Sequence, residues 1–162
     1  MQNQNLKSSL KESIEKAFHF SEPHKALEFL TEIQEFEEAA NFVRLKINQL
    51  SDNQYYTLRP GSEILREIDP LATTLLCRKM IQPILEETKS KYYNYAVKDL
   101  VTCGNLSAKI TNWEVYASHA VYFQELEVKH KRKISFWAEY KVALQKQATK
   151  ETKGLAQKNK EL

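Results

Sequence analysis

The chain has 162 residues, a length that fits one domain built around a single core. Hydrophobic residues make up 42% and charged residues 28%, which is typical of globular proteins and excludes general disorder. No apolar run approaches the roughly 20 residues that a membrane-spanning helix needs, and the first residues lack the apolar stretch of a secretory signal. We therefore expect a cytoplasmic protein that does not associate with membranes.

The formal net charge is a mild +3, but it is unevenly distributed along the chain. Residues 1–88 carry 10 Lys and Arg against 14 Asp and Glu, whereas residues 89–162 carry 14 against 7. The C-terminal half is therefore basic, which either attracts an acidic partner or serves solubility.

Glycine and proline are scarce, with three and four residues. That is too few to punctuate many short strands, while Leu, Ala, Lys, Glu and Gln are plentiful and favour helices. We predict an all-α fold of six to eight helices, arranged as antiparallel helical hairpins.

Three helices are predicted in the first 50 residues. The first begins near Ser9, where Ser9 and Glu12 form a capping-box pattern ahead of apolar residues at helical spacing. The second is predicted to be capped by Ser21, with Pro23 in its first turn. The third ends at Leu50, before the polar segment SDNQ.

The middle of the chain predicts an interrupted segment followed by a long helix. Pro60 and Gly61 are expected to break any helix that begins near Tyr55, so that a short helix starts only at about Ser62. The pair Asp69-Pro70 then provides a cap and a first-turn proline. Apolar pairs repeat every four residues from Leu76 to Leu85, which predicts a helix buried on two sides, and Pro83 should bend it.

The next helix begins near Tyr92 and Tyr93 and is expected to end at Gly104, which gives a helical hairpin with its predecessor. The tyrosine doublets at 55–56 and 92–93 lie 37 residues apart, a spacing within the range of helical-hairpin repeats.

An unbroken helix over residues 116–144 would place lysines on its apolar face, so we predict a break between Lys131 and Ser135. Ser135 would cap the final helix, and Phe136, Trp137 and Tyr140 would turn inward, with the stem of Lys133 over the aromatic pair. Residues 1–145 form the predicted helical-repeat domain, and residues 146–162 a lysine-rich helical tail that frays or projects from it.

A resemblance to a known family rests on residues 54–140. The stretches YYTLRPGSEIL, DPLATTLLCRKMIQPIL, KSKYYNYAVKDL and HKRKISFW occur in this order. Together they resemble a family of uncharacterised bacterial helical proteins, a domain of unknown function whose relatives are sometimes linked to SWIM-type zinc fingers. The resemblance implies a tetratricopeptide-like right-handed α-α superhelix and carries over no catalytic residue. A SWIM finger needs clustered Cys and His ligands, which this sequence lacks.

The sequence contains no glycine-rich phosphate loop, no HExxH motif and no nucleophile elbow. Cys77 and Cys103 have no metal-ligand spacing and are expected to be reduced core residues. We therefore expect a non-enzymatic protein without a cofactor or metal.

Two binding functions remain from the sequence. The first is a protein–protein interaction module or scaffold that binds another protein or a peptide, as helical-repeat proteins do on their concave face. The alternative is an accessory domain that binds nucleic acid through the basic half. The identity of the partner and the oligomeric state are left open. Five residues are candidates for binding. Lys91 and Tyr93 lie at the second tyrosine doublet, and the basic segment contributes Lys131, Arg132 and Lys133.

Overall fold

The computed structural model describes residues 2–158, with side chains described for residues 4–154, and within this part of the chain it contains eight α-helices and no strand. The helices are α1 (Gln2–Ala17), α2 (Pro23–Glu32), α3 (Phe36–Lys46), α4 (Tyr55–Ile64), α5 (Pro70–Glu86), α6 (Tyr93–Ser107), α7 (His119–His130) and α8 (Ile134–Lys158). Two short 3-10 helices, η1 (Ile47–Gln49) and η2 (Ser90–Tyr92), follow α3 and precede α6. The predicted all-α fold and helix number are confirmed.

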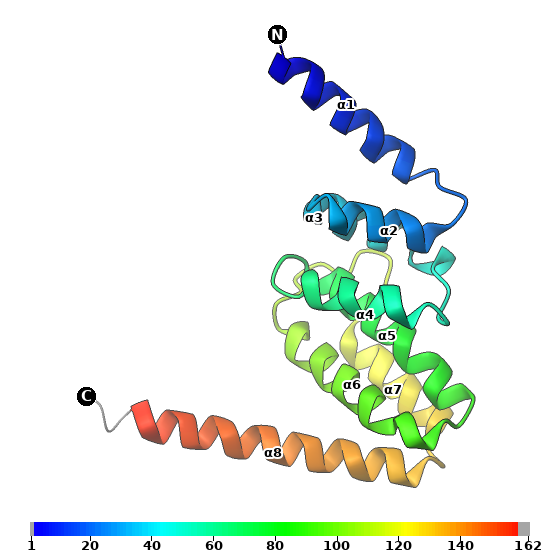
Figure 1. The fold of residues 1–162 in the computed structure, drawn as a ribbon. Coiled ribbons are helices and arrows are strands. Elements are labelled where there is room, and N and C mark those ends of the chain that lie inside the picture. The colour runs from blue at the N-terminus through cyan, green and yellow to red at the C-terminus, as the bar shows by residue number, and fades with distance from the viewer. Residues whose placement is uncertain (1, 159–162) are drawn as a thin grey trace.

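The helices stack in chain order from one end of the molecule to the other (Figure 1). Helix α1 lies at one end, α2 and α3 form the next layer, α4 to α7 form the body, and α8 lies at the opposite end. Helix α5 packs against α3, α4 and α6, and its interface with α6 is the most extensive. The short connection between α5 and α6 makes this pair the predicted helical hairpin.

Helix α5 forms the centre of the hydrophobic core. Its side chains are buried on both sides along most of its length, as the apolar pairs predict. The start of the helix is also as predicted, because the Asp69 carboxylate accepts a hydrogen bond of 2.8 Å from the Ala72 N–H, and Pro70 occupies the first turn. Helix α5 continues through Pro83 to Glu86, and the bend at Pro83 stays a prediction.

Several predicted helix ends are wrong. Helix α1 begins at Gln2 rather than near Ser9, because no proline or glycine stops the helix in the polar residues before the serine. Helix α2 has the predicted proline, Pro23, in its first turn, but its N-cap is Glu22, and Ser21 does not cap it. Gly104 does not end α6, which continues to Ser107.

The predicted break at Pro60 and Gly61 is also wrong, since both lie inside α4. Pro60 is exposed and removes only one hydrogen bond of the helix. Gly61 is buried where α4 crosses its neighbours, and a Cβ atom added there would lie 3.3 Å from Leu27 Cδ2 and 3.5 Å from Leu76 Cδ1. The glycine thus permits α4 to approach α2 and α5 closely.

The break in the C-terminal segment lies where it was predicted, because α7 ends at His130 and α8 begins at Ile134. Ser135 lies inside the first turn of α8, so its predicted role as the cap is wrong. Helix α8 runs through the predicted domain boundary at residue 145, and residues 148–154 are exposed. The last four residues of the predicted tail lie outside the described residues, and the division into domain and tail stays a prediction.

None of the helices described over residues 2–158 combines the length and the apolar character that a membrane crossing requires.

Candidate functional site

A buried ion pair joins α4 to α6. Arg59 donates two parallel hydrogen bonds to Asp99, from Nη1 to Oδ1 at 2.6 Å and from Nη2 to Oδ2 at 2.7 Å. The Asp99 side chain is 2% exposed and that of Arg59 is 22% exposed. Arg59 Nε also donates to the Tyr55 hydroxyl at 3.0 Å, and the guanidinium carbon lies 5.2 Å from the centre of the Tyr55 ring. Three of the five guanidinium N–H groups of Arg59 therefore have hydrogen-bond partners.

Each charge of the Arg59–Asp99 pair offsets the cost of burying the other charge. Burial raises the pKa of Asp99, and the hydrogen bonds and charge of Arg59 oppose that rise. Burial alone would lower the pKa of Arg59, but the bonds and charge of Asp99 raise it above its usual value. A bidentate pair of this kind fixes the spacing and orientation of the two helices that carry it.

Above this pair lies a groove of about 540 Å³ between α4, α6 and α8, which we call the α4–α6–α8 groove. Its lining includes Tyr55, Arg66, Tyr95, Lys98, Asn105 and Ala143, with Arg59 and Asp99 among the lining residues and Thr73 and Cys77 contributed by α5. Tyr95 is 42% exposed, and Arg66 and Lys98 are exposed. The groove therefore offers an accessible aromatic ring beside two solvated cations.

The two site residues predicted near η2 differ in their accessibility. Lys91 is exposed, with its Nζ 5.0 Å from the centre of the Tyr92 ring. Tyr93 is only 2% exposed and packs edge-to-face on Phe136, with ring centres 5.6 Å apart. The prediction that Tyr93 lines a binding groove is therefore corrected, because its ring belongs to the core. The tyrosine of α6 that faces the groove is Tyr95, two residues further along the chain.

The three predicted cationic residues lie together in the turn between α7 and α8. With Lys129 they surround a shallow cavity of about 510 Å³, and we call Lys129, Lys131, Arg132 and Lys133 the basic turn. Lys131 and Arg132 are exposed. Lys129 Nζ lies 2.5 Å from a carboxylate oxygen of Glu86, and Lys133 Nζ donates to the Thr88 hydroxyl at 2.8 Å.

Trp137 anchors α8 to the end of α7. Its indole N–H donates to the carbonyl oxygen of His130 at 3.0 Å, and the half-buried ring packs edge-to-face on Phe136 and Phe123. Phe136 is completely buried. The inward orientation of these aromatic rings is as predicted, whereas the Lys133 ammonium bonds to Thr88 at the edge of the basic turn.

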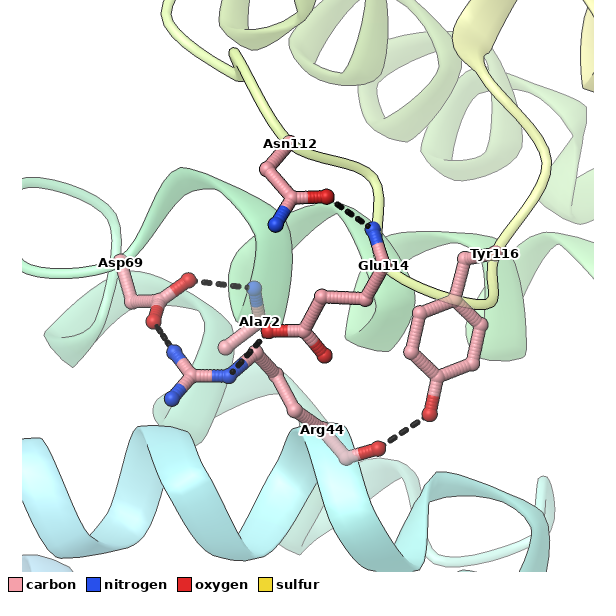
Figure 2. A network of polar contacts seen from close by, with 6 residues as sticks. All are labelled: Arg44, Asp69, Ala72, Asn112, Glu114 and Tyr116. Carbon is pink, nitrogen blue, oxygen red and sulfur yellow. Dashed lines mark hydrogen bonds and ion pairs between the residues drawn. The ribbon is translucent and has the colours of Figure 1, made fainter.

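The connection between α6 and α7, residues 108–118, is fixed to the body of the protein by the polar network in Figure 2. Arg44 of α3 contacts the Asp69 carboxylate, and its Nε lies 3.3 Å from a carboxylate oxygen of Glu114. The Tyr116 hydroxyl donates to the carbonyl oxygen of Arg44. Glu114 has a φ of 51°, and its N–H bonds to the Asn112 side chain at 2.8 Å. The network thus joins this connection to α3 and to the start of α5.

The same connection contacts Arg78 of α5. Arg78 Nη1 donates to the carbonyl oxygen of Ala117 at 2.8 Å. Its guanidinium carbon lies 4.2 Å from the centre of the Tyr122 ring and 5.1 Å from that of Trp113. Nε and Nη2 are buried and have no hydrogen-bond partner among the described residues. Burial lowers the pKa of this guanidinium.

Sequence reasoning missed these internal arginines and their partners. One signal for the Arg59–Asp99 pair was present, because Asp99 follows Ala96 and precedes Cys103 on the apolar face of its helix. A carboxylate in that position needs a cationic partner. The partner lies 40 residues away, and no local pattern identifies it.

Cys77 and Cys103 are buried free thiols, as expected for core residues. Their mutual contact and burial raise the pKa of Cys77, which makes its thiolate a minor species. Within the described residues, no group of three His, Cys, Asp or Glu side chains is arranged to hold a metal ion.

The part of the chain that the structure describes is an all-helical domain with a groove between α4, α6 and α8. Residues 8–139 match the model of a family described as a family of unknown function (DUF6880), and the chain belongs to this family. This agrees with the resemblance to a helical domain of unknown function. No curated protein matches the chain. No solved structure matches it.

Proposed function

We propose that this protein is a non-enzymatic interaction module that binds an extended segment of another protein in the α4–α6–α8 groove. The observation that carries the proposal is the combination of a pre-formed groove with a fixed floor and an accessible ring. The Arg59–Asp99 pair fixes α4 against α6, so a ligand does not have to order these helices when it binds. Tyr95 and Lys98 offer stacking and charge at its edge.

The charges in the groove favour an acidic segment. Lining cations are Arg59, Arg66 and Lys98, and lining carboxylates are Glu63 and Asp99. Arg59 and Asp99 neutralise each other, and Arg66 and Lys98 outnumber Glu63. An acidic peptide with an aromatic or aliphatic side chain would complement both the charge and the tyrosine ring.

We also propose that the hairpins continue into a tetratricopeptide-like right-handed superhelix. The order of layers along the chain and the α5–α6 hairpin support this arrangement. In such a superhelix, α4 and α6 would line the inner face on which helical-repeat proteins bind their partners.

The test measures how strongly the protein binds acidic peptides from a library displayed on beads. It compares alanine variants of two tyrosines, one inside the groove and one outside it. Tyr95 lines the groove, whereas Tyr56 is 91% exposed and is not among the lining residues. We expect Tyr95→Ala to weaken binding of the selected peptides at least about tenfold, and Tyr56→Ala to leave it unchanged. Equal losses in the two variants, or no selection of acidic peptides, would contradict the proposal.

A second function, binding of nucleic acid, is favoured by the basic turn. The cavity at the basic turn is lined by these four cations and by one carboxylate, that of Glu86. The test is the salt dependence of binding to a single-stranded oligonucleotide. If two or three phosphates contact the turn, log Kd against log salt concentration has a slope of about 1.5–2, and the double variant Lys131→Gln and Arg132→Gln lowers it by about 1 or more. A slope that the double variant does not change would exclude this function for the basic turn.

A further inference from the structure

The charge of Arg78 lacks the partner that Arg59 has. Both side chains are internal cations between helices, and Arg59 donates a bidentate pair of bonds to a carboxylate. The corresponding edge of Arg78, formed by Nε and Nη2, has no hydrogen-bond partner among the described residues. An internal cation without a hydrogen-bonded counter-charge is costly, so this edge is a candidate binding site for an anionic group.

The surroundings of Arg78 restrict what that ligand can be. Tyr122 and Trp113 lie 4.2 and 5.1 Å from the guanidinium carbon, and Nη1 is engaged with the Ala117 carbonyl. The remaining edge presents N–H groups on Nε and Nη2 that point in nearly the same direction. This geometry matches two oxygens on one atom, as in a carboxylate.

A cavity of about 380 Å³ adjoins Arg78 between α5 and α7. Its lining has three cations, Arg78, Lys79 and Lys129, and two carboxylates, Glu86 and Glu125, which leaves a single positive charge to be neutralised. His130 also lines it, and burial lowers the pKa of this imidazole, which favours its neutral form. One excess charge suits a monoanion better than a phosphate dianion.

Apart from the amide side chains of Asn48 and Gln82, the remaining lining of the cavity is apolar or aromatic. It includes Ile47, Leu75, Tyr116, Tyr122 and Leu126. Its volume lies in the range of small-molecule sites. A ligand with an apolar body would therefore bury that body here while its charged group faces Arg78.

We propose that Arg78 and the cavity beside it bind a small monocarboxylic acid with an apolar body, whose carboxylate accepts two hydrogen bonds from Nε and Nη2 of Arg78. Both nitrogens are closed off from solvent. Binding of the acid therefore requires the side chains packed around the guanidinium, among them Tyr122 and Trp113, to shift. This site is separate from the α4–α6–α8 groove and does not depend on the function proposed for it.

The experiment uses Trp113 as its reporter, in the 162-residue chain with Trp137→Phe so that Trp113 is the remaining tryptophan. Sodium hexanoate and sodium acetate replace sodium chloride at constant ionic strength. We expect a saturable change in Trp113 fluorescence, with hexanoate binding at least about tenfold more tightly than acetate because its longer chain buries more apolar surface. Arg78→Lys keeps a charge but loses the paired donors, and it should weaken hexanoate binding at least about tenfold.

Arg132→Lys is the matched control, because it makes the same substitution at an exposed residue outside the cavity and should leave the affinity unchanged. Hexanamide tests the proposal without any variant at position 78, since it has the same chain without the charge and should not bind. Equal binding of hexanamide and hexanoate, unchanged affinity in Arg78→Lys, or no saturable response to hexanoate would overturn the proposal.

Discussion

Replacing Asp99 with asparagine removes the charge from the buried ion pair beneath the α4–α6–α8 groove and keeps the shape of the side chain. The asparagine amide oxygen still accepts one hydrogen bond, but the NH₂ group replaces the second acceptor, so the variant loses one of the two bonds of 2.6 and 2.7 Å and leaves Arg59 without its counter-ion. Breaking a fully buried pair in this way costs about 3–5 kcal/mol. The Arg59 side chain is 22% exposed, and this partial contact with water lowers the expected cost to about 2–4 kcal/mol.

Urea denaturation followed by circular dichroism at 222 nm measures this cost. With a denaturant slope of about 2 kcal/mol/M, the midpoint should fall by about 1–2 M. Glu63→Gln is the control, because it neutralises an exposed carboxylate of the same groove and should change the unfolding free energy by less than about 0.5 kcal/mol. The double variant Arg59→Met and Asp99→Leu should recover most of the loss, since it leaves no unpaired charge. An Asp99→Asn midpoint equal to that of Glu63→Gln would refute the reasoning.

Four further predictions concern pH, packing and the tail. Burial, and then the charge of Arg78, lower the pKa of His119 below its usual 6.5, so the unfolded chain binds the proton more readily. The unfolding free energy should therefore fall as pH drops below about 6.5, and His119→Gln should reduce that slope between pH 7 and 5 in urea titrations. Gly61→Val should cost about 1–3 kcal/mol by overpacking, whereas Gly154→Ala, with open space around it, should cost nothing; thermal unfolding distinguishes them. Trp137→Ala should cost about 2–4 kcal/mol, and a change below about 1 kcal/mol in its urea midpoint would contradict the anchoring role. Deleting the chain from Lys150 onward should change the unfolding free energy by less than about 0.5 kcal/mol by calorimetry, because residues 150–154 are exposed, and a large drop would show that the tail docks.

Features set by neighbouring residues were predictable from the sequence. Asp69 and Pro70 start α5 as expected, because a cap and a first-turn proline act within one turn of helix. The break between α7 and α8 was predictable as well, since a continuous helix would have placed charged residues on its apolar face. Both inferences need only the spacing of residues along one helix.

Features set by tertiary packing were not predictable in this way. Gly61 and Gly104 were expected to interrupt or end helices, but both lie inside them. A Cβ atom on Gly61 would meet Leu27 and Leu76, and one on Gly104 would lie 3.5 Å from Nε2 of His119. Close approach between helices therefore accounts for Gly61, whereas a Cβ atom at Gly104 would make only an ordinary contact. The sequence alone does not distinguish a glycine at a close approach from one in a turn.

The candidate sites show the same division. The cationic character of residues 129–133 was evident from the sequence, and the structure gathers these side chains around one cavity. The partners of Arg59 and Arg78 come from segments about 40 residues away, so their opposite states, one paired and one unpaired, depend on the complete fold. Tyr93 and Tyr95 are two residues apart on α6, yet only Tyr95 lines the groove, because the ring of Tyr93 packs on Phe136 of α8.

The central position of α5 has a consequence for how the protein opens. Helices α3, α4 and α6 all pack on α5, so the amide groups of α5 become accessible to solvent only when those contacts are lost together. Hydrogen exchange of these amides should therefore report global unfolding. The far end of α8 has exposed side chains and should exchange through local fraying. Most helices also contact their neighbours in the chain, which gives a low contact order and favours rapid folding. Hydrogen exchange should therefore be slowest in α5, where it reports global unfolding, and faster toward the far end of α8, where it reports local fraying.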